Sequence, residues 1–503
     1  MQETLNTSAF GKNDIRGIYP TEVNAKLFYY AAKGYAKWAK EQFQKANIVK
    51  NYNEMLFAVC MDARLHSPEL KKAVIEGLSS IGANVLDLGL APTPLGYYSE
   101  FAQIDESALN GNKINGALII TASHNPSEYN GLKMTFNKTC LIEEDIKEVK
   151  KYTEEAFNNR EQQGYRSLLS GSIIEYNLIP TYIEKISNNF DKIGNGIKVV
   201  VDSANATAGV VAPDLYRELG CEVIELFSKP DGNFPNHHPN PSDEKTLDAI
   251  KKEVVEAKAD FGLAFDGDSD RLGVIDSSGN KIAGDLLILI YALDLIDSLK
   301  GRGEKPVVVS EVKCSQALYD TINAKGGEAI MWKTGHSYIK SKMKEKHALL
   351  AGEMSGHLFF KDRYYGFDDA MYAGCRIIEI VAKNKKQNPN FKIEDLIDEY
   401  RKMFYAMEIR LPCPNELKKP VLKALEEKMT EELFGSKIKE IVTIDGMRLI
   451  FEDGFALIRQ SNTEPVFTMG FEATTKEKCE KYYNTLVDET QKLVDSLKVS
   501  DKI

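Results

Sequence analysis

The feature that most constrains the fold is a pattern that recurs along much of the chain. A short apolar run rich in β-branched residues is followed by a polar loop and then by a segment with helical spacing of apolar residues. Strands that alternate with helices in this way build parallel or mixed sheets covered by helices, so we predict an α/β fold. The apolar runs lie at residues 56–60, 117–120, 199–201, 261–265, 307–309 and 347–351.

The C-terminal part of the chain has a different pattern. Three apolar runs, at residues 441–444, 447–451 and 455–459, are separated only by short segments that contain Asp-Gly. Such close spacing favours antiparallel strands. A helix is predicted after them, because Thr474 and Glu477 have the spacing of a capping box and the apolar residues that follow share one face. This part is therefore predicted to be α+β.

The length of the chain predicts several domains. At 503 residues it is too long for a single hydrophobic core. The changes of pattern place boundaries near residues 168, 280 and 396. The expected domains are residues 1–168, 169–280 and 281–396, all α/β, and the α+β domain at residues 397–503.

Composition and charge exclude several classes of protein. A net charge of −10 without a long basic run argues against nucleic acid as a partner. The longest apolar run, residues 286–293, is too short to cross a bilayer, and residues 1–6 do not look like a secretory signal. Seven scattered cysteines are typical of reduced core thiols. We expect a cytoplasmic protein that binds a small molecule, with neither nucleic acid nor a membrane as partner.

The first candidate for chemistry is the loop at residues 121–126, which follows the apolar run 117–120. It places the Ser123 hydroxyl beside the His124 imidazole. Open α/β sheets bind ligands at the carboxyl ends of their strands, so a nucleophile here would face a crevice. Taken alone, Ser123 is also typical of a turn and His124 of a structural histidine. The combination with the loops that follow favours a catalytic interpretation.

The second candidate is a run of alternating acids, Asp266, Asp268 and Asp270, directly after an apolar run. In an extended loop their carboxylates lie on one side and can converge. Hard oxygen ligands of this kind select a cation such as Mg²⁺. The calcium loop of an EF-hand is excluded, because its sixth and twelfth positions, which require Gly and a bidentate acid, hold Arg271 and Ser277.

Two later segments suit a phosphorylated sugar. Residues 459–465 offer the Arg459 guanidinium, two hydroxyls and an amide next to turn backbone, a combination that binds phosphate. In residues 353–357, the Glu353 carboxylate accepts and the Ser355 hydroxyl donates, so the pair can bond neighbouring sugar hydroxyls.

Seven motifs, taken in chain order, resemble the α-D-phosphohexomutase superfamily, and most closely its bacterial phosphomannomutase/phosphoglucomutase branch. The resemblance covers nearly the whole chain. Two departures lie in the first domain: Asn13 stands where the family has Tyr, and residues 59–64 replace part of a Gly-Arg-Asp-x-Arg core. The motifs are at residues 14–17, 121–126, 231–239, 266–271, 333–337, 353–357 and 459–465.

The resemblance implies four domains around a central cleft. Three would be mixed α/β sheet domains of similar topology, and the C-terminal one would be an α+β domain of the TATA-binding-protein-like class. The resemblance places the phosphoserine loop in the first domain, the metal in the second, sugar binding in the third and phosphate binding in the fourth.

The resemblance also implies a role for individual residues. Ser123 would carry a phosphoryl group and would hold Mg²⁺ together with Asp266, Asp268 and Asp270. The other catalytic candidates would be His124, Arg271, Lys133, His336 and Arg16. The substrate-binding candidates would be Lys313, Glu353, Ser355, His357, Arg459, Ser461, Asn462 and Thr463.

The implied reaction is an intramolecular phosphotransfer that isomerises hexose 1-phosphate and hexose 6-phosphate. It would pass through a phosphoserine enzyme and a hexose 1,6-bisphosphate, which is both intermediate and activator. Met354 resembles the branch that accepts mannose and glucose phosphates, whereas Gln at this position marks the phosphoglucosamine branch. Phosphoglucosamine mutase is therefore the alternative, followed by a magnesium-dependent sugar-phosphate phosphatase and a non-catalytic scaffold.

Overall fold

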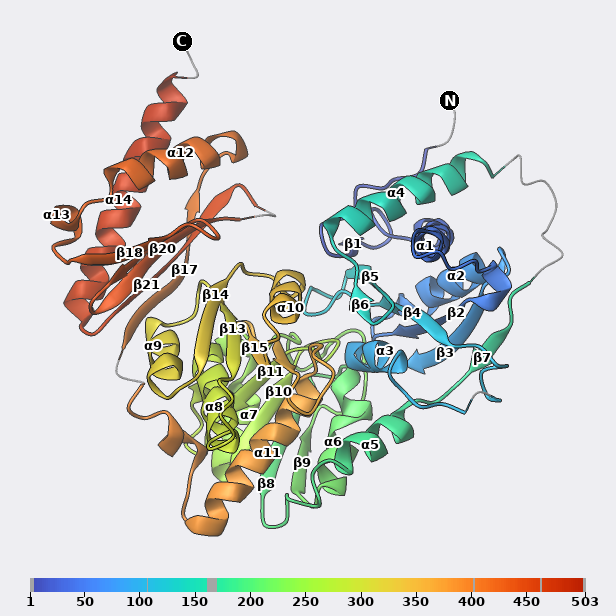
Figure 1. Cartoon of the computed structure of the whole chain (residues 1–503), viewed down its shortest axis with the longest axis horizontal. Helices are drawn as coiled ribbons and strands as arrows, with labels where there is room; N and C mark the ends of the chain where they lie inside the picture. The colour runs from blue at the N-terminus through green and yellow to red at the C-terminus, as the bar shows by residue number, and fades with distance from the viewer. Residues whose placement is uncertain (1–3, 106, 161–169, 401–402, 462–463, 501–503) are drawn as a thin grey trace. The chain divides into compact units, whose positions relative to one another are not determined.

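The computed structural model describes residues 4–105, 107–160, 170–400, 403–461 and 464–500. The chain divides into two compact units, both drawn in Figure 1. The first unit comprises Met1–Ile282, Ser355–Leu358 and Phe367–Ile393. The second unit comprises Ala283–Met354, Phe359–Gly366 and Glu394–Ile503.

The N-terminal sheet of the first unit is mixed, with the strand order β1-β5-β4-β2-β3-β7 and β6 paired to β5. β2, β3, β4 and β7 run parallel, and β5 runs antiparallel to both β4 and β1. The predicted strands at residues 56–60 and 117–120 are confirmed as β2 and β4. The strands are β1 Ile15–Ile18, β2 Leu56–Met61, β3 Asn84–Leu90, β4 Ile114–Ile120, β5 Tyr129–Phe136, β6 Thr139–Cys140 and β7 Ile173–Glu175. The helices are α1 Ala25–Lys45, α2 Ser67–Ser79, α3 Thr93–Ser99 and α4 Glu143–Asn158.

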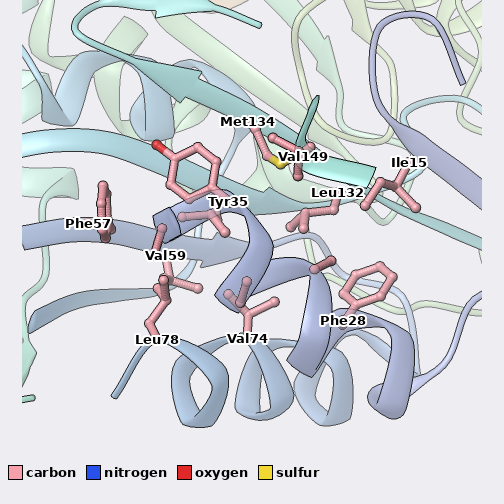
Figure 2. Packing of buried hydrophobic residues seen from close by; sticks show 14 of the residues in the cluster. Ile15, Phe28, Tyr35, Phe57, Val59, Val74, Leu78, Leu132, Met134 and Val149 are labelled. Carbon is pink, nitrogen blue, oxygen red and sulfur yellow. The ribbon is translucent and has the colours of Figure 1, made fainter. Parts of the chain in front are cut away.

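A continuous apolar core holds these helices to the sheet. Side chains from α1, α2, β2 and β5 meet in one buried cluster, among them Tyr35, Val59, Leu78 and Leu132 (Figure 2). The Tyr35 ring packs edge-on against Phe57, with ring centroids 5.2 Å apart. Each fully buried side chain of this size contributes about 1.5–3 kcal/mol, so the core fixes the ends of β2 and β4 where the candidate loops begin.

The second sheet of the first unit has the order β12-β11-β10-β8-β9. β8, β9 and β10 are parallel, whereas β11 runs antiparallel to β10. The predicted strands at residues 199–201 and 261–265 are confirmed as β8 and β10. The strands are β8 Lys198–Asp202, β9 Glu222–Leu226, β10 Phe261–Phe265, β11 Leu272–Ile275 and β12 Lys281–Ile282. The helices are α5 Ile179–Ser187, α6 Ala212–Glu218, α7 Asp248–Glu256 and α11 Ala370–Gln387.

The second unit begins with a sheet of order β14-β13-β15-β16, in which β13 is parallel to β14 and β15. One expected strand is shifted: residues 347–351 were predicted, but the strand begins at Leu350. His347 has φ of 52° and ends the turn after the preceding helix. The strands are β13 Val307–Glu311, β14 Glu328–Trp332, β15 Leu350–Gly352 and β16 Leu358–Phe360. The helices are α8 Gly284–Ser298, α9 Gln316–Ala324 and α10 His336–Glu345.

The C-terminal sheet is antiparallel throughout, in the order β17-β21-β20-β19-β18, and the predicted α+β class is confirmed. The helix cap differs by one residue from the prediction, because the amide of Lys478 donates to the Thr475 hydroxyl and not to Thr474. The strands are β17 Phe404–Pro412, β18 Ile438–Val442, β19 Met447–Phe451, β20 Gly454–Gln460 and β21 Val466–Ala473. The helices are α12 Asn415–Lys428, α13 Glu431–Phe434 and α14 Lys476–Ser500.

Short 3₁₀ helices complete the described structure, at Tyr52–Glu54, Thr207–Val210, Glu244–Thr246 and Ile393–Leu396. All seven cysteines are free thiols and six are buried, as their spacing predicted. Over the parts of the chain that the structure describes, no helix combines the length and the apolar character needed to span a bilayer.

Candidate active site

Three catalytic candidates of the first unit, Ser123, His124 and Arg271, lie on loops that follow the carboxyl ends of parallel strands. β2 and β4 are neighbours, with Met61 opposite Ile120, so the loop that begins at residue 62 and the serine loop, residues 121–126, start side by side. In the second sheet, β10 is parallel to β8 and leads into the acidic loop, residues 266–271. This is the edge at which open α/β sheets bind their ligands.

Ser123 is buried and adopts a left-handed backbone conformation, with φ of 51°. Its Oγ donates to Asp266 Oδ2 over 2.9 Å and lies 3.1 Å from His124 Nδ1. A β carbon added to Gly267 would lie only 2.4 Å from the Ser123 carbonyl oxygen, so the acidic loop can approach this closely only with glycine there. The structure thus brings the predicted nucleophile into direct contact with the first acid of the triplet.

The three carboxylates of the acidic loop are buried and converge. Asp266, Asp268 and Asp270 are at most 1% exposed, and each offers an oxygen within 4.8 Å of the others. The amides of Asp270 and Arg271 both donate to Asp266 Oδ1 at 3.1 Å, which curls the loop around that carboxylate. Burial raises the pKa of Asp266 well above its ordinary value, and Asp270 and Asp268 add to the rise. Such a cluster requires compensating positive charge.

Lys133, on β5, supplies part of that charge. Its Nζ donates to Asp268 Oδ2 at 2.6 Å and to Asp270 Oδ2 at 2.5 Å. Burial alone would lower the pKa of Lys133, but the two carboxylates outweigh burial and raise it. Arg16, on β1, donates to the Asn125 side chain in the serine loop at 2.9 Å. Both predicted cations therefore border the region where Ser123 meets the acidic loop.

Arg271 and His357 lie next to each other beside the acidic loop. Arg271 Nε donates to His357 Nε2 at 3.2 Å. His357 Nε2 also lies 3.3 Å from Asp270 Oδ1. The Ser355 hydroxyl lies 3.4 Å from the other ring nitrogen of His357. The charge of Arg271, followed by burial, lowers the pKa of His124 well below its ordinary value. Within the first unit, two residues expected to bind substrate thus adjoin the acidic loop.

The donor set of the acidic loop fits a divalent cation. It consists of carboxylate oxygens, which are the ligands of hard cations. Asp268 Oδ2 accepts from Thr93 at 2.6 Å and from Lys133, whereas its buried Oδ1 has no hydrogen-bond partner among the described residues. A buried carboxylate oxygen without a partner is unfavourable, and a bound cation would satisfy it.

A second buried group, Asp270, His357 and Asp368, also places its ligand atoms within 4.8 Å of one another. It is a poorer metal site than the acidic loop, because His357 Nε2 already accepts a hydrogen bond from Arg271. Coordination and that hydrogen bond would compete for the same lone pair.

The second unit brings three other candidates to neighbouring loops. Glu353, just after β15, accepts from the amide of Gly335 at 2.6 Å, next to His336 at the start of α10. Lys313 lies just after β13, and its Nζ is 3.4 Å from Glu311 Oε1. The same Glu311 oxygen accepts a hydrogen bond from the amide of Met354, the residue after Glu353. Because β13 and β15 are parallel neighbours, these loops meet at one edge of the sheet.

A basic pocket of the second unit contains two of the predicted phosphate ligands. Arg459, near the end of β20, donates to Asp445 Oδ2 from Nε at 2.9 Å, and its Nη2 lies 2.7 Å from the same oxygen. Arg459, Lys313 and Arg410 line an open pocket together with Thr468. Several cations around one pocket suit an anionic group such as a phosphate.

Ser461 follows directly after β20. Its hydroxyl accepts from the amide of Glu464 at 3.1 Å, and its carbonyl oxygen accepts from Lys418 Nζ at 2.9 Å. Lys418 also donates to the carbonyl of Glu464, so it contacts both residues. Asn462 and Thr463 lie outside the described residues.

Sequence reasoning missed several residues that shape these sites. Thr93 could have been found, because it is the third residue after β3, next to the end that carries the other loops. Asp445, Arg410 and Lys418 had no local signal, since an isolated charge in a turn, strand or helix is usually solvated. Arg64 was noticed only as part of a family core and received no role.

Comparison with known proteins assigns the chain to a family. Phosphoglucomutase/phosphomannomutase α/β/α domains I, II and III match residues 7–160, 180–279 and 283–400, and the C-terminal domain of that family matches residues 408–489. The chain belongs to the phosphoglucomutase/phosphomannomutase family, and the resemblance found in its motifs is confirmed.

Individual relatives span almost the full length. A phosphomannomutase/phosphoglucomutase of Pseudomonas syringae pv. tomato is 36% identical over 493 residues, covering 98% of this chain and 97% of the relative. A phosphoglucomutase of Neisseria gonorrhoeae is 37% identical over 482 residues, covering 96% of each. A crystal structure of a phosphoglucomutase/phosphomannomutase family protein from Burkholderia thailandensis has a TM-score of 0.84 and 33% identity, with 98% of both chains covered. The expected fold class, three mixed α/β sheet domains and a C-terminal α+β domain, agrees with these matches.

Proposed function

We propose that this chain is a phosphohexomutase that interconverts hexose 1-phosphate and hexose 6-phosphate, with mannose and glucose as the hexoses. The observation that carries the proposal is the hydrogen bond of 2.9 Å between Ser123 Oγ and Asp266 Oδ2, two residues that lie 143 positions apart. A hydroxyl held against a buried carboxylate triplet is the arrangement that a serine needs to accept and release a phosphoryl group. Nearly full-length relatives named for this activity support the proposal.

The proposed reaction consists of two phosphoryl transfers in opposite directions. In the first, the bond between Ser123 Oγ and phosphorus breaks and the free hydroxyl of the hexose phosphate forms a new bond to that phosphorus. The sugar hydroxyl releases its proton to a base, and Ser123 Oγ gains a proton from an acid. The product is hexose 1,6-bisphosphate and the free Ser123 hydroxyl. After the sugar reorients, Ser123 Oγ gives up its proton and takes the other phosphoryl group, while the sugar oxygen that loses this group gains a proton. Phosphate count and charge are therefore conserved over the cycle.

Asp266, Asp268 and Asp270, with an oxygen on Ser123, would hold Mg²⁺. When bound, the cation would act as a Lewis acid that offsets negative charge on the transferring phosphoryl group. Arg271 and Lys133 already lie beside the same oxygens and add positive charge there. The acid and base are proposed to come from Lys133, Arg16, His124 and His336.

The second unit offers the groups that would hold the rest of the substrate. The basic pocket formed with Arg459 and Lys313 would bind the phosphate that is not reacting, and Ser461, Asn462 and Thr463 would add further phosphate ligands. Glu353 would bond sugar hydroxyls. Ser355 and His357, which belong to the first unit, are likewise proposed to bind substrate. The four domains at residues 1–168, 169–280, 281–396 and 397–503 remain our proposed division of these tasks.

Two measurements test the proposal. Intact mass after incubation with glucose 1,6-bisphosphate should show one added phosphoryl group, and turnover should be compared on mannose, glucose and glucosamine 1-phosphates with Mg²⁺ and the bisphosphate present. Similar rates on mannose and glucose are expected, because these sugars differ only at C2. A strong preference for glucosamine 1-phosphate would assign the chain to the amino-sugar alternative. Release of inorganic phosphate without isomerisation would make it a phosphatase.

A further inference from the structure

One buried arginine outside the site described so far contacts the whole serine loop. The Arg64 side chain has no solvent exposure and donates five hydrogen bonds, as many as a guanidinium has N–H groups. Nε donates to Asp62 Oδ2 at 3.0 Å. The other four bonds run to backbone carbonyl oxygens of the serine loop and of the first residue of β5. These are Ser123 at 2.9 Å, Asn125 at 2.7 Å, Pro126 at 2.5 Å and Tyr129 at 3.2 Å.

The loop requires such support because of its backbone. Ser123 is not glycine, yet its φ of 51° lies in the left-handed region, which is unfavourable for most residues. Its carbonyl oxygen accepts a hydrogen bond from Arg64 Nη2, which satisfies a buried acceptor. Because hydrogen bonds to a charged donor are stronger than those to a neutral one, the guanidinium stabilises the strained loop.

Arg64 is itself held rigidly. Asp62 Oδ2 accepts from its Nε, while Asp62 Oδ1 accepts from the Arg64 amide at 3.1 Å and from the Ser67 hydroxyl at 2.6 Å. The amide of Asp62 in turn donates to the carbonyl of Ile120, the last residue of β4. The residues that follow β2 therefore hold the serine loop, which follows the neighbouring strand β4.

A segment from the second sheet closes over the same arginine. A β carbon on Gly232 would lie 2.5 Å from the Ala63 carbonyl oxygen and from the Leu65 amide, so residue 232 rests on the backbone around Arg64. The Phe234 ring centroid lies 5.4 Å from the guanidinium carbon. These residues belong to the motif at residues 231–239, for which the proposed reaction supplies no role.

We infer that Arg64 is a positioning residue that holds Ser123 Oγ in line for both phosphoryl transfers. This inference rests on the proposed mutase function. Arg64 does not touch the reacting atoms; it acts through the backbone of the serine loop, and Asp62 and the segment around Gly232 keep it in place. The five N–H groups of the guanidinium point in fixed directions within one plane. A lysine ammonium has only three donors, all on one nitrogen, and cannot make the same set of bonds.

The test compares Arg64→Lys with the wild-type protein in steady-state turnover of glucose 1-phosphate. We expect kcat to fall by about 100-fold, the scale of a displacement of about 1 Å at a reacting group, while KM changes less than about threefold. The rate at which Ser123 takes a phosphoryl group from glucose 1,6-bisphosphate, followed by intact mass, should fall by the same factor. The matched control is Arg376→Lys, a buried arginine of α11 that pairs with Glu379 in the same unit and should keep wild-type kcat.

A milder variant covers the case in which Arg64→Lys does not fold. Asp62→Asn keeps the side-chain shape but removes the charge that orients Nε, and it should lower kcat by about tenfold with KM retained. A wild-type kcat in either folded variant, or a fall in kcat that Arg376→Lys shares, would overturn the inference. If the wild-type protein itself does not isomerise the sugar phosphate, the proposed function fails instead, and the two failures are thereby distinguished.

Discussion

The region around Ser123 and the basic pocket around Arg459 both pair cations with carboxylates, but they differ in how far these groups are exposed. Around Ser123 the charged groups are buried and bonded to one another, as with Lys133 between two carboxylates. In the pocket of the second unit the cations are also paired with carboxylates, but their side chains keep some exposure, 11% for Arg459, 18% for Lys313 and 57% for Arg410. The difference teaches that ion pairing is common to both regions, and that greater exposure is what leaves the pocket open to a charged ligand.

Removal of the proposed nucleophile should have the largest effect on turnover of all the substitutions considered for the two regions. Ser123→Ala is expected to lower mutase turnover by at least about 10⁴-fold, because no phosphoryl carrier remains. The free energy of unfolding should change little, because the substitution removes a hydrogen bond worth about 1 kcal/mol. Ser127→Ala, at an exposed position directly after the serine loop, is the control. Turnover near the wild-type rate in Ser123→Ala would mean that another residue carries the phosphoryl group.

Loss of one proposed metal ligand should have the next largest effect. Asp268→Asn is expected to lower kcat/KM by at least about 100-fold, because a Lewis acid at a phosphoryl group is worth several kcal/mol. Calorimetric titration with Mg²⁺ should show weaker binding in the same variant. Asp243→Asn, an exposed acid elsewhere in the first unit, should bind Mg²⁺ as the wild-type protein does. Equal Mg²⁺ affinity in Asp268→Asn would remove the acidic loop as the metal site.

The basic pocket should respond in KM, in contrast to the serine loop. Arg459→Ala is expected to raise KM for the hexose phosphate by about 10- to 100-fold with kcat nearly retained, because a charge-assisted hydrogen bond is worth about 1.5–3 kcal/mol in both ground and transition states. Lys439→Ala, an exposed cation on β18, is the control. A fall in kcat with constant KM would place Arg459 among the groups that act only in the transition state.

The smallest expected effect is on thermal stability, and it concerns a buried acid of the second unit. Burial raises the pKa of Glu472 to about 7. Because this folded-state pKa lies above the unfolded value, the stability that the group contributes is complete below about pH 4.5 and is lost as the pH rises through 7. Glu472→Gln should therefore flatten the fall of Tm between pH 5 and 8 by a few degrees. Glu440→Gln, at an exposed position, should leave the slope unchanged.

The sequence allowed prediction of the groups that follow a buried strand directly. Ser123 and the acids 266, 268 and 270 were found because each motif is contiguous and stands after a recognisable apolar run. Their mutual contact could only be inferred through the family, since it depends on how two sheets meet. Arg64 and Asp445 could not be predicted, because their partners are backbone or side-chain atoms that only the folded chain brings together. The strand start at Leu350 and the cap at Thr475 show the one- to three-residue uncertainty of local patterns.

Gly267 determines how the chain can vary. Its hydrogen lies where any side chain would press against the Ser123 carbonyl group, so the spacing between two loops of different sheets depends on the absence of a methyl group. Even alanine, the smallest replacement, would push Ser123 away from the three aspartates while leaving every ionisable group in the chain intact.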